Sequence, residues 1–371
     1  MLIGVPKEIK NNEYRVGLVP GSVRELIANG HQVMVQSGAG VGIGFDDHAF
    51  EQAGAKIVKT AVEIFQAAEM IIKVKEPQPE ECRMLREGQV LFTYLHLAPD
   101  PEQAKLLQKS GCIAIAYETV TNSRGGLPLL APMSEVAGRM AIQAGATCLE
   151  ITNKGSGVLL GGVPGVAPAK VVVLGGGVVG TNSVRVAMGM GANVTVIDKS
   201  LERLYHLDLQ FGSKITTIYS TTDAIEEYVV GADLVVGAVL VPGGSAPRLV
   251  TRNMLKKMRH GSVMVDVSID QGGCFETSRA TTHQDPTYIV DGVVHYCVSN
   301  MPGAVPRTST FALNNATLPF VLELANWGYK EALCRDPHLL NGLNICKGKL
   351  THQAVANALN QGYTPALSVL N

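Results

Sequence analysis

The sequence lacks the features that would indicate a membrane, a nucleic acid or a metal as its main partner. Only 17% of the 371 residues are charged, and the formal net charge is −1. No strong electrostatic field is therefore available to hold a polyanion or an acidic membrane surface. The nine histidines form no H-x-x-x-H or H-E-x-x-H pattern and do not cluster with cysteine or carboxylate, so no metal site is expected. These absences favour a small-molecule partner.

Signals for export and for a membrane span are also missing. The seven cysteines form no C-x-x-C pair and stand in apolar surroundings, so we expect reduced thiols in the core. The most apolar stretch, 155–180, is interrupted by Pro164, Pro168 and Lys170, which excludes a lipid-spanning helix of about 20 residues. The first residues reach proline and charge at once, without the basic and apolar regions of a signal peptide. A cytoplasmic protein is expected.

Aromatic residues are few, at 5%, whereas glycine is abundant, at 40 residues, which suits the many turns of an α/β enzyme. Short β-branched runs alternate with amphipathic stretches, and this alternation predicts mostly parallel sheets. The strand-like runs are 2–5, 31–35, 70–74, 90–94 and 113–116, and then 170–174, 193–197, 232–238 and 262–267. Because a chain of 371 residues is long enough for two hydrophobic cores, we predict an α/β fold of two domains that are joined by long helices.

The domain boundaries are expected at helical segments. A helix-like stretch covers about 134–149, and the tail from about Phe311 again has apolar residues at helical spacing. We expect this tail to return to the first domain. The first domain is therefore predicted over 1–130 plus 307–371, and the second over 131–306.

The strongest motif is a G-x-G-x-x-G loop between a buried-type strand and a helix-like segment. The strand 171–174 runs directly into Gly175, Gly177 and Gly180, and the helix-like segment 181–190 follows. Gly175 allows a tight turn, Gly177 lets the backbone approach a pyrophosphate, and Gly180 permits close packing of the helix. The N-terminus of that helix supplies free N–H groups and a favourable dipole for the phosphates. The context predicts a dinucleotide site.

An acidic residue at the end of the next strand selects the cofactor. Asp198 follows 193–197 and is placed to accept hydrogen bonds from the adenosine ribose hydroxyls. A 2′-phosphate would be repelled there, so NAD is expected rather than NADP, although Lys199 and Arg203 lie near. The second domain is therefore predicted to be a Rossmann-type NAD-binding domain, and the first a Rossmann-like substrate domain. The alternative is a glycine-rich turn in an unrelated α/β protein.

Four polar residues follow predicted strands of the two domains. Lys75 and His96 follow the runs 70–74 and 90–94, Asp270 follows a run that ends near residue 269, and Arg15 lies in the loop after the first strand. Ligands of parallel sheets bind at the carboxyl ends of strands. Arg15 and Lys75 are candidates to bind a substrate carboxylate, and His96 and Asp270 are candidates for proton transfer.

The two cations also have structural interpretations. Lys75 could form a surface pair with Glu76, and Arg15 could pair with Glu13 or Glu8. The sequence alone does not decide between these ion pairs and a role in substrate binding.

The two proton-transfer candidates have such interpretations as well. His96 could bond a loop carbonyl, and Asp270 could cap the glycine turn that follows it. Hydrolysis is dismissed, because the G-x-S-x-G pattern occurs only in part at 155–157 and lacks a strand before the serine.

Taken together, several segments resemble the alanine dehydrogenase family, and the resemblance spans essentially the whole chain. The segments that carry it are 3–8, 15–20, 73–77, 94–98, 131–135, 175–180, 265–273 and 298–306.

The resemblance implies roles for individual residues. Arg15 and Lys75 would bind the carboxylate and carbonyl end of alanine or pyruvate, and His96 and Asp270 would handle protons at the reacting carbon. Asn300 would lie near the substrate. The residues that would contact NAD are Ser134, Gly175, Gly177, Val178, Val179, Gly180, Asp198, Arg203, Ser220, Val239, Leu240, Val267, Ser268, Ile269, Arg279, Val298, Ser299 and Met301. For Ser134, an N-cap role on the linking helix is an equal reading.

The reaction that the resemblance implies is oxidative deamination of L-alanine by NAD to pyruvate, ammonia and NADH. It also suggests a homo-oligomer, a hexamer, with no nucleic-acid or membrane partner. One rival is the soluble part of a proton-translocating transhydrogenase, which needs a membrane partner; against it we set Arg15, Lys75, His96 and Asp270 and the lack of a hydrophobic C-terminal extension. A saccharopine-acting relative is a weaker rival. A non-enzymatic NAD sensor would keep the glycine loop and need no carboxylate clamp.

Overall fold

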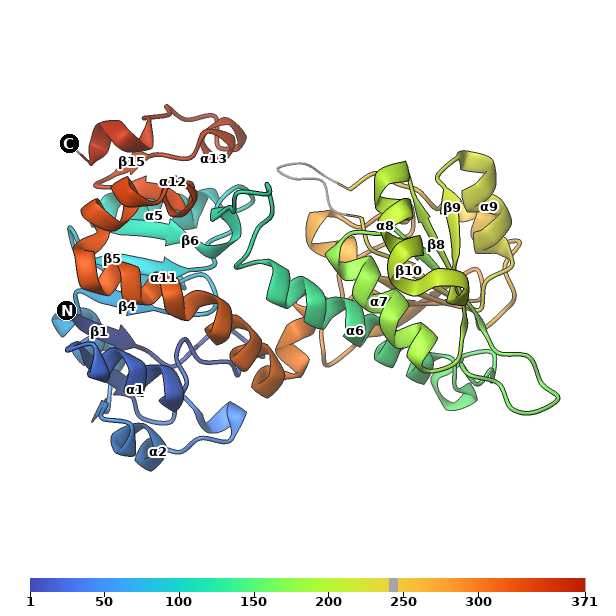
Figure 1. The fold of residues 1–371 in the computed structure, drawn as a ribbon, viewed down its shortest axis with the longest axis horizontal. Coiled ribbons are helices and arrows are strands. Elements are labelled where there is room, and N and C mark those ends of the chain that lie inside the picture. Colours follow the sequence, from blue (N-terminus) through green and yellow to red (C-terminus); the bar gives the residue numbers. More distant parts are fainter. Residues whose placement is uncertain (240–245, 371) are drawn as a thin grey trace. The chain divides into compact units, whose positions relative to one another are not determined.

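A computed structural model describes residues 1–239 and 246–370 of the chain. The chain divides into two compact units, Met1–Met133 with Val305–Asn371, and Ser134–Ala304. We call them unit 1 and unit 2. Both contain a mostly parallel sheet with connecting helices, so the predicted two-domain α/β fold is confirmed (Figure 1).

The sheet of unit 1 has the strand order β15-β14-β6-β5-β4-β1-β2-β3, in which β1 to β6 are all parallel. Its strands are β1 Leu2–Val5, β2 Gln32–Gln36, β3 Lys56–Val58, β4 Met70–Ile72, β5 Val90–Thr93, β6 Ile113–Ala116, β14 Leu343–Cys346 and β15 Lys349–Leu350. The strands β4, β5 and β6 are buried along their whole length, as expected for parallel strands covered on both faces.

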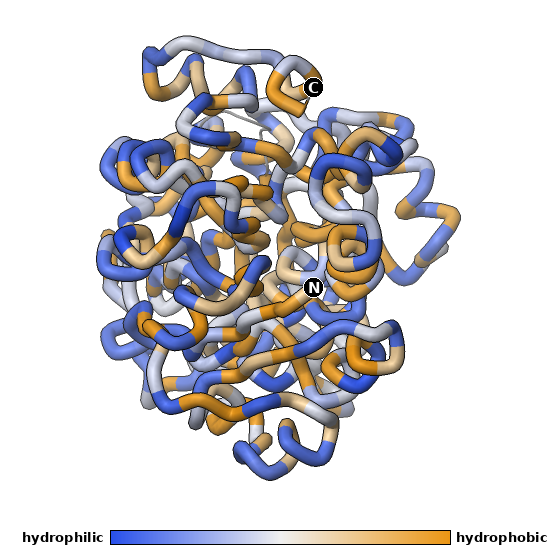
Figure 2. The backbone as a smooth tube through the Cα atoms, turned by 90° about the vertical axis from the view of Figure 1, so that its left-hand side faces the viewer, coloured by the Kyte–Doolittle hydropathy of each residue, from blue (hydrophilic) through white to orange (hydrophobic). Residues whose placement is uncertain are grey.

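Helices from both ends of the chain cover this sheet. They are α1 Pro20–Ala28, α2 Asp47–Gln52, α3 Ala61–Ala67, α4 Pro79–Met84, α5 Pro101–Ser110, α11 Pro306–Arg335, α12 Pro337–Leu340 and α13 Gln353–Ala358. Leu313, Val321 and Leu324 of α11 belong to the same buried cluster as Ile3 and Val5 of β1. The C-terminal tail is therefore part of the core of unit 1. Figure 2 shows that hydrophobic and hydrophilic stretches alternate along the backbone.

The sheet of unit 2 has the order β12-β13-β11-β10-β7-β8-β9. Its strands are β7 Lys170–Leu174, β8 Asn193–Asp198, β9 Thr216–Tyr219, β10 Leu234–Gly237, β11 Val263–Asp266, β12 Thr287–Val290 and β13 Val293–Tyr296. The helices are α7 Val178–Gly189, α8 Leu201–Phe211, α9 Thr222–Val230 and α10 Arg252–Leu255, and α6 Ala131–Cys148 crosses the boundary between the units. From β9 to β13 the order is that of a doubly wound dinucleotide-binding sheet, with β12 added antiparallel at the edge.

Three sequence-based expectations are corrected. The strand before Asp270 ends already at Asp266, and Val267–Gln271 form a 3-10 helix. Ser134 is not an N-cap, because α6 begins at Ala131. Cys334 is exposed, whereas the other six thiols are buried as expected. Within the described part of the chain, no helix is both long and apolar enough to cross a membrane.

Candidate functional site

In unit 1 the polar candidates gather at one edge of the sheet. The strands β1, β4, β5 and β6 are neighbours and run parallel, so their carboxyl ends lie along the same edge. Arg15 follows β1, Lys75 follows β4, and His96 follows β5. From β1 the chain continues to β2 and β3 on one side of β1 in the sheet, whereas β4 lies on its other side and is followed by β5 and β6. The strand order therefore reverses between β1 and β4, and open α/β sheets bind ligands at such a switch point.

Arg15 is held by its neighbour Glu13. The Arg15 Nε and Nη2 groups donate to the two carboxylate oxygens of Glu13 at 2.7 and 2.6 Å, and Nη1 contacts the sulfur of Met133 at 3.0 Å. The Arg15 side chain is 2% exposed and that of Glu13 is fully buried. Burial opposes the charge, but the carboxylate of Glu13 raises the pKa of Arg15, so the guanidinium stays charged. The ion pair that the sequence left open is therefore present.

Lys75 is fixed through its backbone. Its N–H donates to Glu8 Oε1 at 3.4 Å, and its carbonyl accepts from Thr93 Oγ1 at 2.9 Å. The Lys75 ammonium lies 3.7 Å from Glu76 Oε2, and both side chains are about 15% exposed. Lys10 also binds Glu76, and the two lysines hold the pKa of that carboxyl below its ordinary value against the opposing effect of burial. Lys75 and Glu76 thus form a half-buried pair rather than a surface pair.

His96 has an unusual backbone conformation and a half-exposed ring. Its φ is 48°, a left-handed value that few non-glycine residues adopt. Glu118, which follows β6, accepts the His96 N–H at 2.6 Å and lies 4.0 Å from the ring nitrogen Nδ1. The ring stacks on Tyr94 with a centroid distance of 5.8 Å, and its side chain is 43% exposed. The left-handed backbone and the contacts with Glu118 and Tyr94 together fix the position of the imidazole ring.

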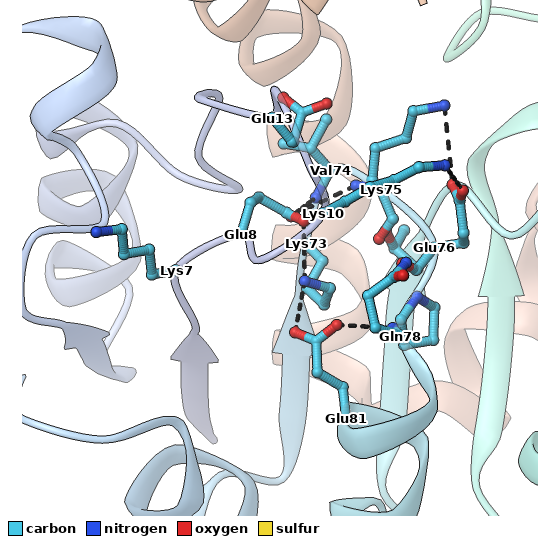
Figure 3. A network of polar contacts seen from close by, with 12 residues as sticks. Lys7, Glu8, Lys10, Glu13, Lys73, Val74, Lys75, Glu76, Gln78 and Glu81 are labelled. Carbon is cyan, nitrogen blue, oxygen red and sulfur yellow. Dashed lines mark hydrogen bonds and ion pairs between the residues drawn. The ribbon is translucent and has the colours of Figure 1, made fainter.

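A buried charge triad lies behind this edge (Figure 3). The Lys73 ammonium donates to Glu8 at 2.9 Å and to Glu81 at 2.8 Å, and all three side chains are at most 2% exposed. Burial raises the pKa of Glu8, although Lys73 opposes the rise. The two carboxylates raise the pKa of Lys73 in spite of burial, so its ammonium is charged.

Sequence reasoning did not assign functional roles to these carboxylates. Glu8 and Glu13 entered only as pairing alternatives for Arg15, and Glu118 was not singled out. A signal existed for Lys73, because a lysine within the apolar run 70–74 must find a buried partner. Glu118 follows a strand-like run, but nothing local connects it to His96, 22 residues earlier.

In unit 2 the glycine loop has the geometry that a pyrophosphate needs. Gly175 has a φ of +101°, and a side chain there would meet the carbonyl of Ala238 at 2.6 Å. A Cβ on Gly180 would lie 1.8 Å from the Gly175 carbonyl, so the helix packs too closely for any other residue. Gly177, the N-cap of α7, has open space where its Cβ would be. Space is therefore open beside the N-terminus of α7, whose first N–H groups have no acceptor within the helix and are suited to a phosphate.

Asp198 binds the glycine loop from the end of β8. Its Oδ2 accepts the Gly176 N–H at 2.6 Å, and Oδ1 accepts the Ser200 N–H at 2.8 Å. Arg203 donates from Nε to the Gly176 carbonyl and from Nη2 to Thr181. Asp198 therefore closes the end of β8 against the glycine loop, where a ribose would lie.

The loops after β10 and β11 are joined by Ser268. Its hydroxyl donates to the Val239 carbonyl at 2.7 Å and accepts the Val239 N–H at 3.0 Å. Asp266 at the end of β11 accepts the N–H groups of Ser268 and Cys274 at 3.0 and 2.9 Å, and burial raises its pKa. Asp270, in the 3-10 helix supported by these bonds, is exposed.

The remaining candidates of unit 2 occupy several elements. Arg279 lies with its guanidinium 4.0 Å from the centre of the Tyr288 ring, and Asn300, with a φ of 60°, accepts from His283 through its carbonyl at 3.2 Å. Leu240 lies outside the described residues. The others lie as follows: Ser134 in α6, Val179 in α7, Ser220 directly after β9, Val267 and Ile269 in the 3-10 helix after β11, Val298 and Ser299 after β13, and Met301 at the start of a 3-10 helix.

A cavity of about 580 Å³ in unit 2 lies elsewhere. It is lined by α6 and by the β12–β13 hairpin, including Gln143, Thr147 and Tyr296, and by none of the cofactor candidates. The glycine loop and the sheet edge of unit 1, rather than this cavity, carry the candidate chemistry. No group of three metal-binding side chains occurs in residues 1–239 and 246–370.

Comparisons with known proteins agree with this geometry. The family model "Alanine dehydrogenase/PNT, N-terminal domain" matches residues 4–137, and "Alanine dehydrogenase/PNT, C-terminal domain" matches 141–353. The alanine dehydrogenase of Halomonas elongata is 60% identical over 370 residues and that of Bacillus subtilis 56% over 371, and each match covers all of this chain and at least 98% of the relative.

Solved structures show the same relationship. A structure of an L-alanine dehydrogenase matches with a TM-score of 0.94 and 54% identity, over 97% of this chain and 99% of that one. A transhydrogenase from Sinorhizobium meliloti shares the fold, with a TM-score of 0.80 and 24% identity over 95% of this chain and all of that one. The resemblance noted from the sequence is confirmed, and the chain belongs to the alanine dehydrogenase/PNT family.

Proposed function

We propose that this protein is an NAD-dependent alanine dehydrogenase, which converts L-alanine, water and NAD⁺ reversibly into pyruvate, ammonium, NADH and a proton. The observation that carries the proposal is the sheet edge of unit 1, where Arg15 and Lys75 follow the two strands of the switch point. Two cations at such a place suit the carboxylate of a small α-acid. Relatives that are 54–60% identical along their whole length carry the name alanine dehydrogenase.

The chain's residues divide the binding work. Gly175, Gly177 and Gly180 would cradle the pyrophosphate of NAD, and Asp198 would bind the adenosine ribose. The further contacts named from the sequence, from Ser134 to Met301, belong to the same proposal. When bound, NAD accepts a hydride from the α-carbon of alanine. Arg15 and Lys75 orient the substrate acid during that transfer, and Asn300 would lie near the substrate.

His96 and Asp270 are assigned to proton transfer. The ammonium group of alanine loses a proton before hydride transfer, so hydride loss gives iminopyruvate, and a water molecule then loses a proton as it adds to the C=N carbon. The carbinolamine collapses when its nitrogen is protonated and leaves as ammonia, while its hydroxyl loses a proton to form the C=O group of pyruvate. We assign His96 and Asp270 as the acid–base groups of these steps, and such help contributes about 10² to 10⁴ in rate. Either His96 or Asp270 activates the water molecule.

Two other functions remain as outcomes of the test. Transhydrogenation between nucleotides would need no carboxylate clamp, and the transhydrogenase neighbour is only 24% identical. An NAD sensor would bind the cofactor without turnover. The ion-paired Arg15 and the positioned ring of His96 favour an enzyme with an acid substrate over both.

The test is NADH formation, followed by absorbance, with purified protein, L-alanine and NAD. The variants Asp270→Asn and His96→Asn should lower kcat by about 10² or more and leave NAD affinity unchanged. Lys75→Ala should raise the KM for alanine and pyruvate. If the wild type binds NAD but turns over neither alanine nor pyruvate with ammonia, the proposal fails and the sensor or transhydrogenase function replaces it.

We further propose a homohexamer in the cytoplasm. Six buried thiols with no disulfide suit a reducing compartment. The oligomeric state is tested by light scattering after size exclusion, in which a mass well below six chains of 39.3 kDa would contradict the hexamer.

A further inference from the structure

The side-chain carboxylate of Glu8 binds the backbone of Lys75, one of the candidate substrate-binding residues. Glu8 lies three residues beyond the end of β1, and it crosses the switch point to the end of β4 (Figure 3). Its Oε1 accepts the N–H of Val74 at 2.7 Å and that of Lys75 at 3.4 Å. These two N–H groups lie beyond the last ladder residue of β4, so they need another acceptor.

The carboxylate of Glu8 is itself immobilised. Its second oxygen accepts from Lys73 at 2.9 Å, and Lys73 is anchored in turn by Glu81 at 2.8 Å. The Oε2 of Glu81 accepts the N–H of Gln78 at the start of α4. The triad thus links the ends of β1 and β4 to the helix that follows, in a region with almost no solvent.

Stability alone is a poor reason for such a triad. Taking three charges out of water costs several kcal/mol per ion in general, and apolar residues of similar size often replace buried ion pairs without loss of stability. What a network of charged hydrogen bonds supplies is a single, rigid geometry. The residue whose backbone geometry is fixed in this way is Lys75. Its carbonyl also accepts a hydrogen bond from the Thr93 hydroxyl at 2.9 Å.

We propose that Glu8 is a positioning residue for Lys75. The carboxylate of Glu8, which Lys73 holds in place, sets the backbone direction after β4. The Lys75 ammonium is then presented to the substrate with only its own side-chain torsions left to order. The inference rests on the proposed role of Lys75 in binding the substrate acid. Preorganisation of this kind reduces the entropy lost when a ligand binds.

The triad offers a matched pair of variants. Glu8→Gln and Glu81→Gln make the same chemical change, each removes a charge that binds Lys73, and both side chains are at most 2% exposed. In each variant a single amide oxygen must serve either Lys73 or a backbone N–H, because the amide nitrogen cannot accept. They differ in the backbone they hold, which is Val74 and Lys75 for Glu8 and Gln78 for Glu81.

The experiment measures the affinity of pyruvate for the complex of full-length enzyme and NAD by calorimetry, together with the KM for NAD and the thermal midpoint. Glu8→Gln should weaken pyruvate binding about tenfold, the factor carried by one hydrogen bond to a charged group, with an unchanged KM for NAD. Glu81→Gln should lose comparable thermal stability and keep pyruvate affinity close to the wild-type value. In a Lys75→Ala background, Glu8→Gln should have no further effect on pyruvate binding.

Thr93→Val, which removes only the bond to the Lys75 carbonyl, should weaken pyruvate binding in the same direction, and it decides the question if Glu8→Gln does not fold. Equal losses of pyruvate affinity in Glu8→Gln and Glu81→Gln would overturn the positioning role of Glu8. So would an effect of Glu8→Gln on pyruvate binding that persists in the Lys75→Ala background. Neither result would affect the proposed role of Lys75. If Lys75→Ala binds pyruvate as the wild type does, the proposed role of Lys75 falls, and the positioning role falls with it.

Discussion

The carboxylate of Glu13 and the guanidinium of Arg15, two residues apart, form a two-bonded ion pair that is almost fully buried. The bonds measure 2.7 and 2.6 Å, and Met133 covers a third guanidinium nitrogen. A substrate-binding arginine held in this way keeps its charge and loses little freedom on binding an acid. Glu13 therefore determines where Arg15 can meet a substrate.

Glu13→Gln is expected to weaken both stability and substrate binding, because one of the two bonds to the buried guanidinium loses its acceptor. Breaking a buried pair costs about 3–5 kcal/mol. Steady-state kinetics should give a higher KM for pyruvate, and thermal denaturation a lower midpoint. Arg15→Lys keeps the charge and loses the planar fork, so it should raise the same KM. Wild-type KM values in both variants would contradict a role of this pair in binding.

Gly177→Ala is expected to fold normally and to bind NAD about tenfold or more weakly. Space is open where the Cβ of Gly177 would lie, and its φ of −65° suits alanine, so the fold itself does not resist the change. The methyl group would instead occupy the space proposed for the pyrophosphate. Gly189→Ala, at the other end of α7 and also open, is the control that should keep wild-type affinity. Fluorescence titration with NADH measures the affinity of both variants. Equal affinities would show that the pyrophosphate does not bind at this loop.

Asp198→Ala is expected to reduce discrimination against NADP. In the proposed site the carboxylate at the end of β8 would repel a 2′-phosphate and would accept hydrogen bonds from ribose hydroxyls, and both effects would disappear in alanine. The ratio of kcat/KM for NADP to that for NAD should rise about tenfold or more, chiefly through a loss with NAD. Asp208→Ala, an exposed acid on α8, serves as the control. An unchanged ratio would show that selection lies elsewhere.

His295 is expected to make the protein less stable as the pH falls. Its ring is fully buried, with one nitrogen bonded to the Val293 carbonyl and the other to the hydroxyl of Thr277. Burial lowers the pKa of His295 below 6.5, so the neutral form is favoured in the folded protein. This contribution is fully present above the unfolded pKa and is lost as the pH falls through the folded one.

The thermal midpoint of the wild type should therefore drop more between about pH 8 and about pH 5 than that of His295→Gln. His352, whose pKa burial also lowers, titrates in both proteins and cancels in the difference. Parallel pH profiles of the two proteins would exclude His295 as a source of acid sensitivity.

Local spacing along the sequence was enough for several features. One strand–helix–strand unit contains the run 171–174, the three glycines and Asp198. Their proposed roles could therefore be predicted without knowledge of distant residues. The alternation of strand-like and helix-like runs similarly determined the fold class. Arg15, Lys75 and His96 could be named as candidates because each follows a strand-like run. Element ends were less certain, as the short strand before Asp270 illustrates.

Only the tertiary structure decided what holds these side chains. Lys73 and Glu8 are 65 positions apart, and His96 and Glu118 are 22 apart, so their pairing depends on the order of β1, β4, β5 and β6 in the sheet. The docking of α11, whose Asn314 binds the backbone of Gly17 and Val19, is equally remote in sequence. Local patterns specify strands, helices and turns, whereas the partner of a buried charge is set by which strands become neighbours, and that is a property of the whole packed chain.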